Sequence, residues 1–87
     1  MADGIDLTDG ISLDYDGLRR AAAQAVQASG QTQAEIAQEL GVHRSSVTRA
    51  LNECGRSRCK MQRRIIALLT PYSVRRRVVF DIHQKEE

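Results

Sequence analysis

The chain has 87 residues and a formal net charge of +2, so it has room for one small domain whose modest core a partner subunit would complete. Hydrophobic residues make up 41% of the chain and charged residues 28%, which excludes a disordered or collagen-like protein. The low aromatic content argues against stacking on single-stranded nucleic acid, and the longest apolar run, residues 65–69, is too short to span a bilayer.

Charge is distributed unevenly along the chain. Residues 1–18 contain five aspartates and no base, whereas residues 44–64 contain seven Lys or Arg residues against Glu53 alone. A dense basic block is typical of a phosphate-binding surface, although a solvated face can have the same composition. The acidic start does not resemble a secretory signal, so we expect a cytoplasmic protein.

Residues 1–15 are expected to form an extended acidic arm or a short hairpin. Apolar residues alternate with polar ones on both sides of Asp9-Gly10, which is the pattern of two strands around a tight turn. A frayed terminus rich in aspartate fits the same stretch. The alternating apolar residues are Ile5, Leu7, Ile11 and Leu13.

A first helix is predicted to begin at Asp14 or Asp16, because either carboxylate can accept the free N–H groups of a first turn. Gly30 is expected to end it in the left-handed conformation. Its apolar positions recur at helical spacing. They are Leu18, Ala22, Ala25 and Val26.

A second helix should begin at a capping box formed by Thr32 and Glu35 and end at Gly41. A third is predicted over about residues 44–53, before Gly55, and a fourth over about residues 58–69, before Pro71. The residues expected to face the core are Ile36, Ala37 and Leu40, then Val47, Ala50 and Leu51, and finally Met61, Ile65, Leu68 and Leu69.

Residues 74–82 alternate in polarity and include β-branched and aromatic side chains, which predicts a strand. Two copies of this strand could pair around a two-fold axis and supply the core that one chain lacks. The predicted dimerisation residues are Val74, Val78, Phe80 and Ile82. Residues 71–87 would then be a dimerisation strand and tail.

The stretch from residue 32 to residue 52 is the most informative. Small Ala37 allows a close helix crossing, Gly41 allows a sharp turn, and Val47 anchors the following helix on the core. With Val47 inward, Ser45, Arg49 and Asn52 point outward. This face is short, polar and cationic, which suits a DNA major groove.

This stretch resembles the helix-turn-helix of the Cro/CI-type (XRE-like) repressor family. The matching residues are Gln33-Ala34-Glu35-Ile36-Ala37, Gly41-Val42 and Arg44-Ser45-Ser46-Val47-Thr48-Arg49. Residues 47–52 are also similar to the recognition helix of LacI-type repressors, but that family places its motif at the extreme N-terminus. The turn at Pro71 departs from the usual fifth helix and looks like small Cro-type or antitoxin-type members.

The resemblance implies a mainly α fold with a small β element: a four-helix helix-turn-helix domain over residues 16–70 and a pairing C-terminal strand. It implies a homodimeric, sequence-specific regulator of transcription, expected to be a repressor, on a palindromic operator in double-stranded DNA. The implied base-reading residues are Arg44, Ser45, Ser46, Thr48 and Arg49. The implied phosphate contacts are Thr32, Gln33, His43, Asn52, Arg56, Ser57, Arg58 and Lys60.

Other chemistries are not expected. A zinc site would require Cys54, Cys59, His43 and His83 to converge, which the position of His43 in the turn disfavours. No nucleophile elbow or phosphate-binding loop is present, so we expect no catalysis, no metal, no cofactor and no membrane partner. The alternative function is a protein-interaction module, such as an adaptor or antitoxin-like protein, whose basic face binds an acidic protein.

Overall fold

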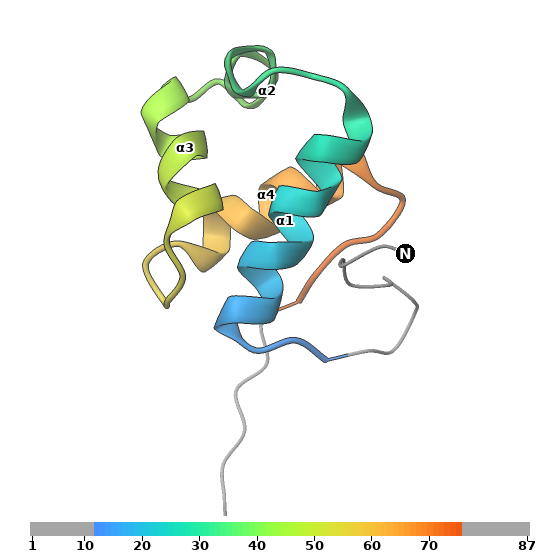
Figure 1. Ribbon diagram of the computed structural model, residues 1–87, viewed down its shortest axis with the longest axis vertical. Helices are drawn as coiled ribbons and strands as arrows, with labels where there is room; N and C mark the ends of the chain where they lie inside the picture. The colour runs from blue at the N-terminus through green and yellow to red at the C-terminus, as the bar shows by residue number, and fades with distance from the viewer. Residues whose placement is uncertain (1–11, 76–87) are drawn as a thin grey trace, which may run out of the picture.

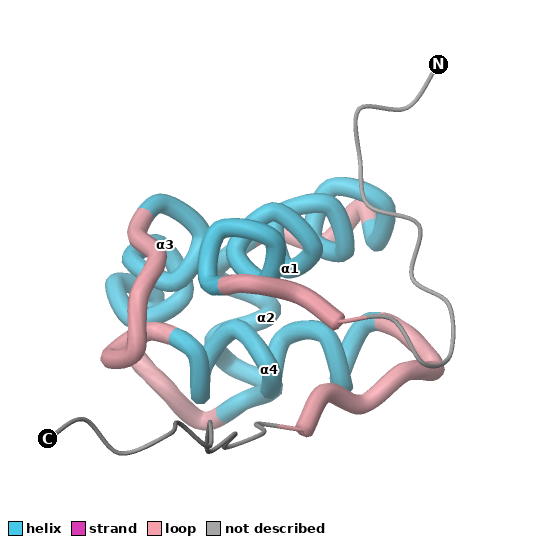
Figure 2. The backbone as a smooth tube through the Cα atoms, turned by 90° about the horizontal axis from the view of Figure 1, so that it is seen from below, coloured by secondary structure: helices cyan, strands magenta, loops and turns pink. Residues whose placement is uncertain are grey.

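The computed structural model describes residues 12–75, and these form four helices: α1 (Tyr15–Ser29), α2 (Gln33–Leu40), α3 (Arg44–Asn52) and α4 (Cys59–Leu69). α1 packs against α4, and α3 contacts each of the other three helices. α2 is seen nearly end-on in Figure 1 while α3 runs down the picture, so the two helices meet at a steep angle. The described part of the chain contains no strand (Figure 2).

The predicted helix ends are confirmed at both α1 and α2. The carboxylate of Asp14 accepts the N–H of Gly17 at 2.7 Å, and Gly30 follows α1 with a φ of 71°. At α2 the hydroxyl of Thr32 accepts the N–H of Glu35 at 3.1 Å, and the Glu35 carboxylate accepts the N–H of Thr32 at 2.9 Å. These contacts satisfy backbone donors that an isolated helix leaves unpaired, which matters for a helix as short as α2.

All four helices contribute to one core. Each helix contributes at least one side chain with no exposed surface, namely Ala22 in α1, Ile36 in α2, Val47 in α3 and Ile65 in α4. Alanines on α1 and α2 lie between the larger side chains, so the helices approach closely. The buried residues of the core are Leu18, Ala21, Ala22, Ile36, Ala37, Val47, Ala50, Leu51, Cys59, Ile65 and Ile66.

The inward face of α4 differs from the sequence-based prediction. Leu68 is 37% exposed, and Met61 is only half-buried, whereas Gln62 is completely buried. At about 100° per residue, Gln62, Ile65 and Ile66 share one stripe and Leu68 lies well to the side of it. The apolar residues of α4 are spread over a wider arc of the helix than the face that packs on the core. Hydrophobicity alone therefore predicted Leu68 as a core residue and missed Gln62.

The end of α3 also differs in detail. The helix stops at Asn52, and Glu53 is already extended. Gly55, expected to end the helix, lies in the following loop with a φ of 124°.

The predicted C-terminal strand falls mostly outside the described residues. Of the four predicted dimerisation residues, only Val74 is described: it is not in a strand and packs against the core of its own domain. The strand predicted to begin at Val74 is therefore not seen at this residue, and the assignment of Val74 to a dimer interface stays a prediction. Val78, Phe80 and Ile82 lie outside the described residues, as does most of the predicted arm over residues 1–15.

Candidate nucleic-acid interface

α3 presents the polar face that its sequence predicts. Arg44, Ser45, Arg49 and Asn52 are exposed, while Val47 on the opposite side has no exposed surface. The exposed face carries two guanidinium groups about one and a half turns apart and no acidic side chain. Its donors are therefore free to contact an external, electron-rich partner.

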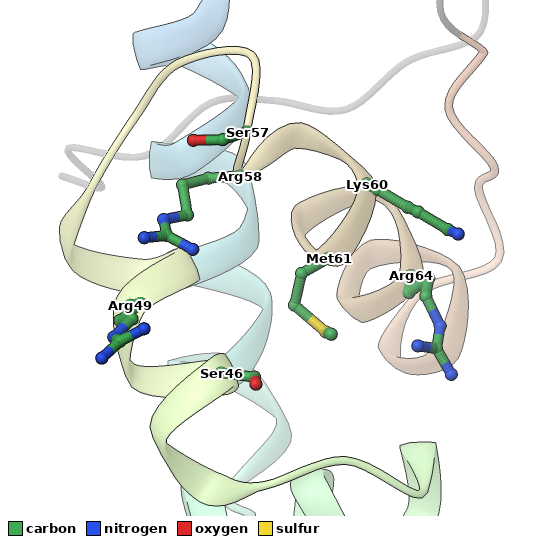
Figure 3. A pocket seen from close by; sticks show the side chains of 7 residues that line it. All are labelled: Ser46, Arg49, Ser57, Arg58, Lys60, Met61 and Arg64. Carbon is green, nitrogen blue, oxygen red and sulfur yellow. The ribbon is translucent and has the colours of Figure 1, made fainter.

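The two predicted flanking residues of α3, Ser46 and Thr48, are half-buried and face different neighbours. Ser46 points towards α4 (Figure 3). The hydroxyl of Thr48 lies against α2, where it donates to Oε1 of Gln33 at 2.5 Å. The two hydroxyls, which were grouped together from sequence, thus have different surroundings.

Side chains from α1 and α4 hold the C-terminal end of α3. The buried Nε2 of Gln62 donates to the carbonyl oxygens of Ala50 at 2.8 Å and Glu53 at 2.9 Å. Arg19 donates to the carbonyl oxygen of Leu51 at 3.3 Å. Because the last carbonyls of a helix have no partner within it, these donors both satisfy α3 and fix it against α1 and α4.

An open groove of about 310 Å³ lies beside α3, between its outer face and the start of α4. Figure 3 shows Arg49 and Arg58 on one side of this groove, with Met61 and Ser46 pointing between them and α4. Four cationic side chains and no acidic one line the groove. We refer to it as the basic groove; its lining residues are Ser46, Arg49, Ser57, Arg58, Lys60, Met61 and Arg64.

One cation of the basic groove is partly neutralised. Nε of Arg58 pairs with Oε1 of Glu53 at 2.9 Å across the loop between α3 and α4. This exposed ion pair contributes little to stability but places the guanidinium at the edge of the groove. The charge of Arg58 is therefore partly compensated by Glu53, whereas Lys60 is exposed.

Arg64 was not among the site residues predicted from the sequence, although it lies in the basic block over residues 44–64. Its Nη2 donates to the carbonyl oxygen of Leu40, the last residue of α2, at 2.8 Å. The contact joins α4 to the turn between α2 and α3 across 24 residues of sequence. No local sequence pattern predicts a contact between residues so far apart. The position of Arg64 in the basic block is the one sequence feature that could have marked it as a candidate site residue.

The remaining predicted phosphate contacts lie around α3. Arg56 and Ser57 are exposed in the loop after it. His43 is the residue before α3, exposed and without a side-chain capping bond. Thr32 is exposed at the start of α2, where its N–H is already bonded to Glu35.

The two hydrogen bonds from Thr32 lower the pKa of the Glu35 carboxyl.

The described residues contain no group of three His, Cys, Asp or Glu side chains that could hold a metal ion. Cys54 is exposed, while Cys59 is buried and its thiol donates to the carbonyl oxygen of Arg56 at 3.2 Å. Within the same residues, no helix has the length and apolar character needed to cross a membrane.

The sequence model of a family described as a homeodomain-like domain matches residues 16–59, which is half of the chain. The matched segment runs from the first turn of α1 to the first residue of α4 and contains the whole of α2 and α3. Neither the curated proteins nor the solved structures give a match to the chain.

Proposed function

Since the chain belongs to the homeodomain-like domain family, a helix-turn-helix class of DNA-binding domains, we propose that it is a sequence-specific regulator of transcription that reads double-stranded DNA with α3. In this proposal α3 enters the major groove, and its exposed face meets the base edges. The chain acts by binding, without catalysis or a cofactor, and works in the cytoplasm.

The observation that supports this function most strongly is the exposed, wholly cationic and polar face of α3 beside the basic groove. Arg44 and Arg49 have the fork of donors that matches guanine O6 and N7. Lys60 and Arg56, on neighbouring segments, are suited to the phosphates that flank the bases. The two arginines would supply sequence preference, and the flanking cations would supply affinity.

We further propose that the protein is a homodimeric repressor of the Cro/CI type on a palindromic operator. The resemblance of residues 33–49 to that family supports the repressor assignment. The alternating pattern of residues 74–82 and the small core of a single chain support pairing of two copies. A two-fold dimer would place the recognition helices about one DNA turn apart, roughly 34 Å.

The direct test is fluorescence anisotropy with labelled duplex DNA over a range of salt concentrations. Wild-type protein should bind, and its affinity should fall steeply with salt as counterions return to the phosphates. The double variant Arg44→Ala/Arg49→Ala should keep its helical circular dichroism and lose selective binding. Absence of salt-dependent binding to any duplex, with the fold intact, would favour the alternative that the basic face binds an acidic protein.

A further inference from the structure

Thr48 makes a contact that joins the two helices of the helix-turn-helix. Its Oγ1 lies 2.5 Å from Oε1 of Gln33, the first residue of α2, and 3.2 Å from the carbonyl oxygen of Arg44 in its own helix. The Gln33 contact spans 15 residues of sequence and, among residues 12–75, is the only hydrogen bond between side chains of α2 and α3. It therefore couples the start of α2 to the middle of α3.

The hydroxyl proton of Thr48 is used in a hydrogen bond within the domain. Both neighbours of Oγ1 are carbonyl oxygens, which only accept, so the single hydroxyl proton must be donated to one of them or shared. A separation of 2.5 Å falls in the range of O–H···O bonds and below that of N–H···O bonds, so the oxygen of the Gln33 amide faces Thr48. Thr48 thus has no proton left to donate to a base.

The orientation of the Gln33 amide follows from this bond. With Oε1 held by Thr48, the Nε2 group is turned away from it, and none of the residues 12–75 accepts a hydrogen bond from Nε2. Gln33 lies in the first turn of α2, where the free backbone N–H groups make the local potential positive. An amide that presents N–H donors at this position is suited to a phosphate oxygen.

We propose that Thr48 is a positioning residue: it fixes the side chain of Gln33 so that Nε2 donates to a DNA phosphate, and it does not itself read a base. This inference rests on the proposed function and refines it. Thr48, which was predicted to read a base, would instead act through the side chain of Gln33. The affinity that Thr48 supplies is then the same for every duplex sequence.

The test compares Thr48→Val, Thr48→Ser, Gln33→Ala and the double variant Thr48→Val/Gln33→Ala in binding to a panel of duplexes. Thr48→Val, which is nearly isosteric, should weaken binding about tenfold on every duplex without changing base preference, and Thr48→Ser should retain wild-type affinity. In the Gln33→Ala background, Thr48→Val should have no further effect. Thr70→Val removes a hydroxyl at the far end of α4 and serves as the matched control, with unchanged affinity.

Two results would overturn the inference while leaving the proposed function intact. One is a loss in Thr48→Val confined to one base pair, which would make Thr48 a reader. The other is an equal loss in the wild-type and Gln33→Ala backgrounds, which would make the two residues independent. The free protein supplies a separate check by NMR, because Thr48→Val should shift the side-chain amide resonances of Gln33. If those resonances shift as expected but wild-type protein binds no duplex, the contact exists and the proposed function is wrong, together with the role of Gln33 in DNA binding.

Discussion

The cations of this domain fall into two groups by their position. Arg44 and Arg49 extend from the exposed face of α3, whereas Arg56 and Lys60 lie in the following loop and the first turn of α4. A helix in the major groove brings the first pair to base edges and the second pair to the sugar–phosphate backbone. Equal charges should therefore have unequal effects on specificity.

We expect Arg44→Ala and Arg49→Ala to weaken binding to the preferred duplex by about 1–3 kcal/mol each and to relax preference at particular base pairs. Arg56→Ala and Lys60→Ala should weaken all sequences alike and reduce the slope of log affinity against log salt by about one unit. Titration of matched and mismatched duplexes at several salt concentrations measures both effects. Equal losses by all four variants on every duplex would show that the two groups do not differ.

A second residue-scale prediction concerns pH. Hydrogen bonds from the backbone and hydroxyl of Thr32 lower the pKa of Glu35 below its ordinary value of 4.5 in the folded protein. A carboxyl whose pKa is lowered by folding stabilises the fold while it is ionised, so its contribution is present above pH 4.5 and is lost as the pH falls through the lower folded value.

The variant Glu35→Gln keeps an acceptor for the capping bond but has no titrating group. Wild-type protein should therefore be more stable than Glu35→Gln near neutral pH, and the difference should disappear under acid conditions, as measured by urea denaturation at several pH values. A stability difference that does not change with pH would show that ionisation of Glu35 does not contribute to the cap.

At the scale of elements, the orientation of α3 depends on contacts made at its two ends. Gly41 and the short turn set its start, while Gln62 and Arg19 bind the carbonyl groups at its end. Loss of the Gln62 donor should destabilise the domain more than loss of the Arg19 donor, because the Gln62 side chain is completely buried. Removal of its amide leaves the carbonyl oxygens of Ala50 and Glu53 without a donor in a poorly solvated place.

We expect Gln62→Leu to destabilise the domain by about 1–2 kcal/mol. The cost of two unpaired carbonyl groups outweighs the gain from removing Oε1 of Gln62, which is buried without a partner. The same change at an exposed glutamine of α1, Gln27→Leu, is the control and should alter stability by less than about 0.5 kcal/mol. Thermal denaturation of both variants decides this, and a neutral Gln62→Leu would show that the end of α3 needs no side-chain donor.

The turn between α2 and α3 allows a graded test of backbone conformation. Gly41 has a φ of 69°, and a Cβ atom there would meet no atom within 4 Å, so a substitution is strained without a steric clash. Gly41→Ala should cost about 1–2 kcal/mol, and Gly41→Asn should cost less, because Asn adopts the left-handed region more readily. Urea denaturation measures the order. A Gly41→Asn variant no more stable than Gly41→Ala would mean that the turn has another requirement.

These elements also show which features a sequence can predict. The capping box of Thr32 and Glu35 and the turn at Gly41 were predictable because each depends on residues within three or four positions. The exposed face of α3 followed from helical periodicity once Val47 was placed inward. Such patterns are local, so one sequence contains them in full.

Contacts between distant segments were not predictable in the same way. The bond from Gln62 to Ala50 crosses 12 residues, and that from Arg19 to Leu51 crosses 32. Nothing in the sequence around Gln62 distinguishes it from an exposed glutamine. Its burial becomes evident only from the positions of the carbonyl groups that it binds. For the same reason, Leu68 was expected in the core, although the packing of α1 on α4 leaves it at the surface.

For the whole molecule, the proposed two-fold dimer requires a DNA site with two inverted half-sites. Truncation after Pro71 would remove residues 72–87, which include Val74, a side chain that packs on the domain's own core. Truncation after Arg75 keeps this contact and removes the rest of the predicted strand, so it is the better test. We expect the full chain to sediment as a dimer and the chain ending at Arg75 as a folded monomer with weaker operator binding. A full-length monomer at tens of micromolar concentration would contradict dimerisation.

The central claim is that α3 reads the sequence of double-stranded DNA. Selection of bound duplexes from a random pool, with wild-type protein and with Arg49→Ala in parallel, tests it most directly. We predict that the wild type enriches one motif as two inverted half-sites about one helical turn apart, roughly 10 base pairs, and that Arg49→Ala loses preference at defined positions in each half-site. Failure of the folded wild type to enrich any motif, or enrichment of the same motif with the same preferences by Arg49→Ala, would contradict the claim.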